Sequence, residues 1–202
     1  MSIEKNKKKT QSLVVTALFA AIIVVLQLCV VIPPIGAAYI TLSLVPIVLG
    51  AVLYGQFYGA GLGLVLGLCV VYQVVFTPDP FSGAMFQLLP VITVILCLVK
   101  TTVAGFVAGL VYKLIGKKNK IAAVFTASAL CPIINTGIYL AGVLLFFGNL
   151  VSGAASEEGK TVLMFILSGV ILTNFIPELI VNMVLAPVII RVSEVASKLI
   201  KR

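Results

Sequence analysis

The stretch QSLVVTALFAAIIVVLQLCVVI, residues 11–32, decides the class of fold. It is apolar over a length that suits the ~20 residues a helix needs to cross the hydrocarbon core of a bilayer. A lysine-rich run from Lys5 to Lys9 precedes it, as in the n-region of a signal peptide. The apolar run is too long for the h-region of such a peptide and lacks a clear small-x-small cleavage site. We therefore expect a retained first transmembrane helix.

The rest of the composition extends this interpretation to the whole chain. Of 202 residues, 61% are hydrophobic and 10% charged, and the mean hydropathy is +1.25. A chain with so little polar surface cannot cover a water-soluble globule, so its solvent is mostly lipid. We predict an all-α membrane protein with a single integral membrane domain (1–202) and six transmembrane helices, at residues 11–32, 39–54, 57–76, 88–115, 121–147 and 161–190. The unequal lengths suggest tilt, kinks at Pro90 and Pro177, or loops that dip into the membrane.

Positive charge sets the expected orientation, because cytoplasmic loops retain lysine and arginine. With the N-terminus inside, an even number of helices places twelve of the fourteen basic residues on the inner side. Lys160 lies on the outer side with Asp79, Glu157 and Glu158, and Lys100 lies within a predicted helix. We expect both termini to be cytoplasmic in the plasma membrane of a bacterium. The inner bases are Lys5, Lys7, Lys8, Lys9, Lys113, Lys117, Lys118, Lys120, Arg191, Lys198, Lys201 and Arg202.

Polar side chains inside apolar segments are the first functional candidates, because burial there costs free energy unless they pair or line a cavity. Asn135 and Thr136 follow Pro132 in the fifth segment, and Lys100 lies in the fourth. The sixth carries Asn174, Glu178 and Asn182 at a spacing of four residues, hence along one helix face. These residues favour a hydrated pocket for a small solute. The alternative is structural: Lys100 and Glu178 pair, or Lys100 reaches the interface and the amides bond across helices.

Several classes of function are disfavoured. The basic runs flank apolar segments and carry no interleaved aromatics, so topology explains them better than nucleic acid binding. The chain has no histidine, and its four cysteines form no CxxC pair, so we expect no metal site and no cofactor. Glu178 is the only carboxylate inside a predicted helix, which argues against an intramembrane enzyme. No nucleotide-binding loop is present, so ATP-driven work would need another chain.

Small residues recur at helical spacing in two segments. Gly55, Gly59, Gly63 and Gly67 lie four residues apart, and we interpret them mainly as an internal packing surface. The alternative is that these glycines form a contact surface for another protein. In the first helix, Ala17 and Ala21 form an AxxxA pair.

Taken together, these features resemble the substrate-binding S component of an energy-coupling factor (ECF) vitamin transporter. The resemblance covers nearly the whole chain. It rests on the AxxxA pair, on LVPIVLGA (44–51) followed by Gly59-Ala60-Gly61, on AGFVAGLVY (104–112), and on Asn135-Thr136-Gly137. It implies a subunit without its own ATPase that binds a vitamin outside the cell. The residues it implies for binding are Asn135, Thr136, Tyr139, Asn174, Glu178 and Lys100, with Tyr39 and Gln87 from the loops.

The resemblance also implies partners. Ala17 and Ala21 would dock onto a membrane-embedded T subunit, and two cytoplasmic ATPases would drive release of the vitamin inwards. The Pro132-x-x-Asn135-Thr136-Gly137 pattern resembles pantothenate-associated members, whereas riboflavin, folate and thiamine remain open. Two other functions stay in view: a stand-alone ion-coupled secondary transporter with Glu178 as proton carrier, and a non-transporting membrane assembly subunit.

Overall fold

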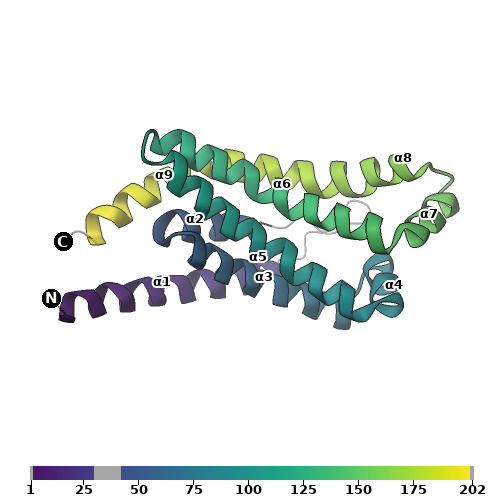
Figure 1. Cartoon of the computed structure of the whole chain (residues 1–202), viewed down its shortest axis with the longest axis horizontal. Coiled ribbons are helices and arrows are strands. Elements are labelled where there is room, and N and C mark those ends of the chain that lie inside the picture. The colour runs from purple at the N-terminus through teal and green to yellow at the C-terminus, as the bar shows by residue number, and fades with distance from the viewer. Residues whose placement is uncertain (1, 30–41, 201–202) are drawn as a thin grey trace.

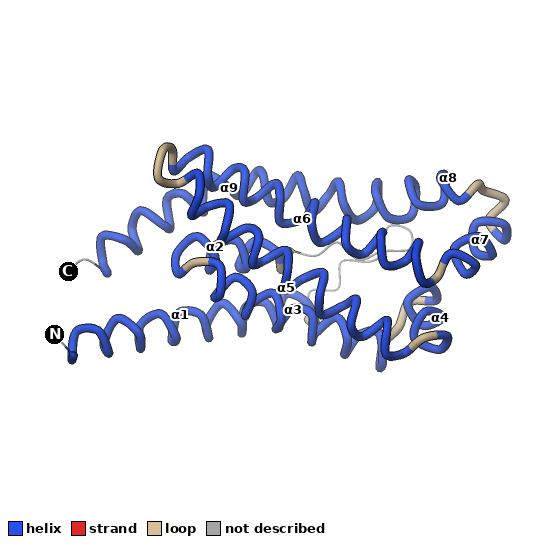
Figure 2. The backbone as a smooth tube through the Cα atoms, viewed as in Figure 1, coloured by secondary structure: helices blue, strands red, loops and turns tan. Residues whose placement is uncertain are grey.

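The computed structural model describes the backbone of residues 2–29 and 42–200, and the side chains of residues 10–29 and 42–196. Every regular element in these residues is a helix (Figure 1, Figure 2). The elements are α1 Ser2–Leu28, α2 Leu44–Tyr54, α3 Gln56–Phe76, α4 Pro80–Leu88, α5 Pro90–Ile115, α6 Lys120–Phe146, α7 Gly148–Glu157, α8 Val162–Ile166, the π-helix η1 Leu167–Phe175, and α9 Ile176–Ile200.

Five of the six predicted segments correspond to helices long and apolar enough to cross a membrane: Thr10–Leu28, Gln56–Phe76, Pro90–Ile115, Lys120–Phe146 and Val162–Ala196. The remaining segment, 39–54, corresponds to α2, which has 11 residues. Such a helix rises about 16 Å, roughly half of the ~30 Å hydrocarbon core. The first residues of that segment lie outside the described part of the chain. The all-helical membrane fold is confirmed, and the number of crossings stays a prediction.

Two short helices occupy segments that the sequence assigned wholly or partly to loops. Asp79 caps α4, because its carboxylate accepts hydrogen bonds from the backbone N–H groups of Phe81 and Ser82, at 3.1 and 2.9 Å. Pro80 follows as the first helical residue, where a missing N–H costs nothing. For the same reason Pro90 begins α5 instead of kinking a longer helix. The other short helix, α7, buries Val151 and Ala155, one turn apart.

The chain ends and the basic turn lie together. In Figure 1, the N-terminus, the C-terminus and the turn between α5 and α6 lie at one end of the bundle, and α4 and α7 lie at the other. Lys117 and Lys118 are in that turn, whereas Asp79, Glu157 and Glu158 belong to the opposite end. The basic turn therefore lies at the same end as both chain ends, which is the arrangement that the predicted orientation needs, and the orientation itself stays a prediction.

The glycine series of α3 packs directly against α5. A Cβ atom added to Gly59 or to Gly105 would overlap the backbone carbonyl of the other residue, and one added to Gly63 would overlap the carbonyl of Thr101. Backbones this close gain dispersion contacts that larger side chains would prevent. Gly61, by contrast, faces open space, with nothing within 4 Å of an added Cβ. Gly59, Gly63 and Gly67 thus form an internal packing surface on one face of α3, whereas Gly55 precedes this helix and has nothing within 4 Å of an added Cβ.

The last helical run changes hydrogen-bond register along η1. The backbone N–H of Ile176 bonds to the carbonyl of Ile171, five residues back. Pro177 has no N–H, so the ordinary α-helical bond to the carbonyl of Thr173 cannot form. The π segment ends just before this proline, so the missing donor coincides with the change of register. The hydroxyl of Thr173 adds a bond to the carbonyl of Gly169 at 2.6 Å.

Candidate functional site

A cavity lies between the helices, on the side of the bundle that α4 and α7 close. It offers about 140 Å³ to water-sized molecules, far more than the ~10–15 Å³ that one water needs. Its wall combines apolar and polar side chains from both halves of the chain. The polar residues of the wall are Gln27, Gln73, Thr77, Asp79, Ser82, Thr93, Lys100, Thr101, Asn135, Thr136, Tyr139, Asn174 and Glu178.

Lys100 is the basic residue of this wall. It lies ten residues into α5, and its ammonium nitrogen is 4.5 Å from the centroid of the Tyr139 ring on α6. The ring face stabilises the cation by its quadrupole. Two ion pairs join described residues, Lys160–Glu158 and Arg191–Glu194. The pair between Lys100 and Glu178 that the sequence offered as an alternative is not among them.

Helix α6 brings the predicted Asn135 and Thr136 to the cavity. They are 8% and 6% exposed and line its wall. The side-chain oxygen Oδ1 of Asn135 has no hydrogen-bond partner among the described residues. A buried amide oxygen without a partner costs about 1–3 kcal/mol, which a bound ligand or water would recover. One turn on, the hydroxyl of Tyr139 donates to the sulfur of Met85 on α4, at 3.8 Å.

The predicted Asn-Glu-Asn face of the last helix divides into two parts. Asn174 and Glu178 line the cavity, and Glu178 is only 1% exposed. Asn182 is fully buried outside the wall, where its Nδ2 donates to the backbone carbonyl of Glu178 at 2.8 Å. The face that reaches the cavity runs along Ile166, Val170, Asn174 and Glu178. A spacing of four overshoots an α turn of 3.6 residues, so the wider π turns help keep this row on the wall.

The sequence predicted two loop residues for the site, Gln87 and Tyr39. Gln87 is exposed on α4 and is not among the residues of the cavity wall. Tyr39 lies outside the described residues. Sequence reasoning missed Gln27, Gln73 and Thr101, three polar residues of the wall. Each is a polar residue in an apolar helix, which is the same signal that indicates Asn135.

Apolar residues line the part of the cavity next to α4 and α7. Met85, Val143, Val151 and Phe165 are each at most 6% exposed. The rings of Phe81 on α4 and Phe165 on α8 pack at 5.8 Å between centroids. The site therefore has an apolar portion at this end and a portion rich in amides, with one ammonium and one deeply buried carboxyl group. It suits a small amphipathic molecule that carries hydrogen-bonding groups.

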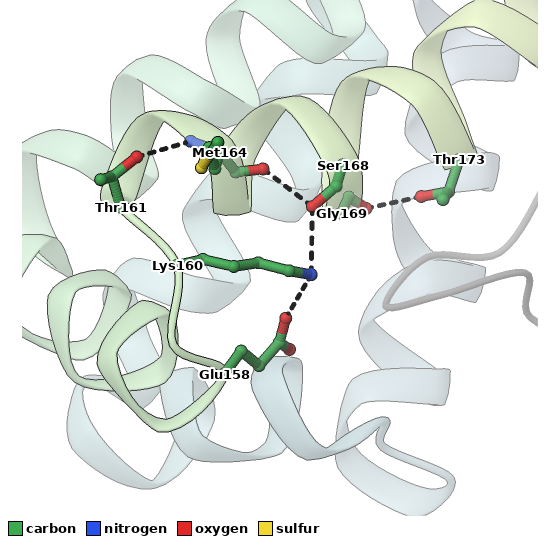
Figure 3. Close-up of polar contacts among 7 residues, drawn as sticks. All are labelled: Glu158, Lys160, Thr161, Met164, Ser168, Gly169 and Thr173. Atoms are coloured by element: carbon green, nitrogen blue, oxygen red, sulfur yellow. Dashed lines mark hydrogen bonds and ion pairs between the residues drawn. The ribbon is translucent and has the colours of Figure 1, made fainter.

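A cluster of polar contacts lies at the same end, between the loop after α7 and the helices α8 and η1. Figure 3 shows the ammonium of Lys160 between Glu158 and Ser168, at 2.7 and 3.4 Å. The Ser168 hydroxyl donates in turn to the carbonyl of Met164 at 2.8 Å, and Thr161 caps the helix start. Because both charged partners are exposed, the ion pair contributes at most about 1 kcal/mol. Its main effect is to fix the loop against α8 and η1.

The first helix buries one face and exposes another. Ser12, Phe19, Ile23 and Gln27 are buried against the bundle. Ala17 and Ala21 are exposed, in a surface that also carries Leu13, Val14, Leu18, Val24 and Val25. The AxxxA pair therefore makes no internal seam of the kind that Gly59 and Gly63 make. Its small side chains face outwards, towards lipid or a partner.

This combination of bundle and internal cavity is that of a membrane-embedded binding subunit, and family comparison agrees. The family model of the ECF transporter, substrate-specific component, matches residues 11–190. The chain belongs to this family of multi-pass membrane proteins, which confirms the resemblance seen in the sequence. A similar protein is the pantothenic acid transporter PanT of Lactococcus lactis subsp. cremoris (strain MG1363). It is 29% identical over 199 residues, covering 92% of this chain and 94% of the relative.

Proposed function

We propose that this chain is the pantothenate-binding subunit of an ECF importer. The main support for this substrate is the position of Lys100, the basic residue among the described residues of the cavity wall. Pantothenate has a carboxylate at one end, an amide in the middle, and two hydroxyls beside a pair of methyl groups at the other. An ammonium held on an aromatic face matches the carboxylate, and the buried amides match the neutral polar groups.

The remaining wall supports the same assignment. Asn135 offers a buried Oδ1 without a partner among the described residues, which suits a hydroxyl or amide donor of the ligand. Glu178 brings a carboxyl group to the same wall, a type of group that hydrogen-bonds to hydroxyls. The second acidic residue of the wall, Asp79, directs Oδ1 at the N-terminus of α4, so that this oxygen is already bonded. The methyl groups would pack on the apolar side chains near Phe165. Similarity to PanT supports this ligand over riboflavin, folate and thiamine.

For coupling, we propose that the exposed face of α1 docks onto a T subunit through Ala17 and Ala21, and that two ATPases power release. Small side chains let helix backbones approach closely, so an outward-facing pair is suited to a partner helix. Both termini would be cytoplasmic, which places the basic turn after α5 inside and the α4–α7 end of the cavity outside.

The decisive experiment is ligand binding by the purified chain in detergent without ATP. Calorimetry with pantothenate is expected to give a dissociation constant in the nanomolar to low micromolar range, and riboflavin, folate and thiamine no signal. Binding of another vitamin in place of pantothenate would contradict the substrate. Transport by the chain alone in proteoliposomes, abolished by collapsing the ion gradient, would contradict the subunit role and favour a secondary transporter.

A further inference from the structure

Two glutamines on the cavity wall are hydrogen-bonded to each other, although 46 residues separate them in the sequence. Gln27 lies in the last turn of α1 and is 6% exposed, and Gln73 lies near the end of α3. The Nε2 of Gln27 donates to Oε1 of Gln73 at 2.7 Å, and the Nε2 of Gln73 donates to the backbone carbonyl of Gln27 at 2.8 Å. The hydroxyl of Ser43 donates to Oε1 of Gln27 at 3.0 Å.

The direction of these bonds is fixed by the backbone. The carbonyl of Gln27 only accepts, so the Gln73 atom facing it must be the NH₂ group. That leaves Oε1 of Gln73 facing the Gln27 amide, which must then donate to it. The remaining oxygen of Gln27 accepts from Ser43. The arrangement also gives a donor to a carbonyl in the last turn of α1, which has no partner within the helix.

A count of hydrogen atoms shows what the pair still offers. Each amide nitrogen carries two N–H groups and uses one of them in these bonds. Among the described residues, no further hydrogen bond takes the second N–H of Gln27 or of Gln73. Both residues line the cavity. The pair therefore keeps two neutral N–H donors that no described residue uses, on the α1–α3 side of the site, while Lys100 brings its cation from α5.

We propose that the Gln27–Gln73 pair is a second binding subsite, which donates hydrogen bonds to a neutral oxygen of the substrate while Lys100 binds the carboxylate. This inference rests on the proposed function, because it assigns the hydroxyl-bearing end of pantothenate to the glutamines. It adds α1 and α3 to a site that the sequence placed in the later helices and loops. It also puts the ligand in contact with the helix that carries Ala17 and Ala21.

The test compares two variants of one network. Gln73→Met keeps the side-chain length and removes the donors. Ser43→Ala removes a bond to Gln27 but leaves both amides, and Ser43 is not in the cavity wall. Both variants are expected to unfold at lower temperature than the wild type. Calorimetry is expected to show pantothenate binding about three- to tenfold weaker in Gln73→Met, and unchanged in Ser43→Ala.

A ligand change separates direct contact from a structural role. The probe is the pantothenate analogue that lacks both pantoyl hydroxyls. The wild type is expected to bind it more weakly than pantothenate, and in Gln73→Met this difference is expected to shrink. An unchanged difference, or equal pantothenate affinity in Gln73→Met and Ser43→Ala, would overturn the subsite.

Failure of the proposed function gives a different result, since the wild type then binds no pantothenate. The two variants are in that case titrated with whichever of riboflavin, folate or thiamine the wild type binds. Weaker binding in Gln73→Met alone would support the amide subsite, and equal binding would overturn it.

Discussion

The ammonium nitrogen of Lys100 lies 4.5 Å from the ring centroid of Tyr139, which joins α5 to α6 on the cavity wall. Away from bulk water, such a cation–π contact contributes about 2 kcal/mol of stabilisation. It stabilises a cation inside the bundle while leaving its N–H donors available to a ligand. A lysine neutralised by a carboxylate would offer an anionic substrate much less.

Replacing Lys100 is therefore expected to affect only ligands that carry a carboxylate. A charge-assisted hydrogen bond contributes about 1.5–3 kcal/mol, so Lys100→Met is expected to weaken pantothenate binding about 10- to 100-fold. Panthenol, in which a neutral alcohol replaces the carboxylate, is expected to bind the variant and the wild type alike. Calorimetry with both ligands measures the difference. Equal losses for the two ligands would show that Lys100 only supports the fold.

Tyr139 allows the ring and the hydroxyl to be tested separately. Tyr139→Phe keeps the aromatic face under Lys100 and loses only the weak bond to the Met85 sulfur, at 3.8 Å. It is expected to bind pantothenate within about twofold of the wild type. Tyr139→Leu removes the face and is expected to bind about five- to thirtyfold more weakly. A loss in Tyr139→Phe as large as in Tyr139→Leu would assign the effect to the hydroxyl instead.

Much of the site could be predicted because a polar group in an apolar helix is conspicuous. Lys100, Asn135 and Glu178 stand out in this way, and all three line the cavity. Gln27 and Gln73 carry the same signal, but their partnership depends on how α1 packs against α3. No local pattern encodes a contact over 46 residues.

The fold shows the same division between local and non-local information. Long apolar runs gave the main helices, and the Asp79-Pro80 pair contains the capping signal for α4 that the sequence prediction passed over. The π register of η1 is different. Pro177 indicates that a hydrogen bond is lost, but the sequence does not say whether the helix kinks, ends or shifts its register.

The α3–α5 crossing gives a stability prediction with an internal control. Gly63→Ala would press a methyl group against the backbone carbonyl of Thr101, so the two helices must separate. We expect a loss of about 1–3 kcal/mol, seen as a lower midpoint of thermal unfolding in detergent. Gly61→Ala points into open space and is expected to be neutral or slightly stabilising, because alanine is the better helix former. Equal effects of the two changes would contradict the close crossing.

Docking through α1 predicts that assembly and ligand binding can be separated by mutation. Ala17 is exposed on α1, so Ala17→Trp adds bulk without entering the core. A partner helix held by close backbone approach cannot accept that bulk. The variant is expected to bind pantothenate as the wild type does, but to lose co-purification with the T subunit and ATPases. Uptake by the reconstituted complex should be lost with it.

The matched control for Ala17→Trp is Ile133→Trp on α6, where the native side chain is 41% exposed. It adds an equally large side chain to a surface that belongs to a different helix. Co-purification and uptake are expected to persist in this variant, so a general effect of a large aromatic at the lipid boundary can be recognised. Assembly that survives Ala17→Trp would remove α1 as the docking surface. Loss of pantothenate binding in Ala17→Trp would indicate misfolding, because no atom of Ala17 contributes to the cavity wall.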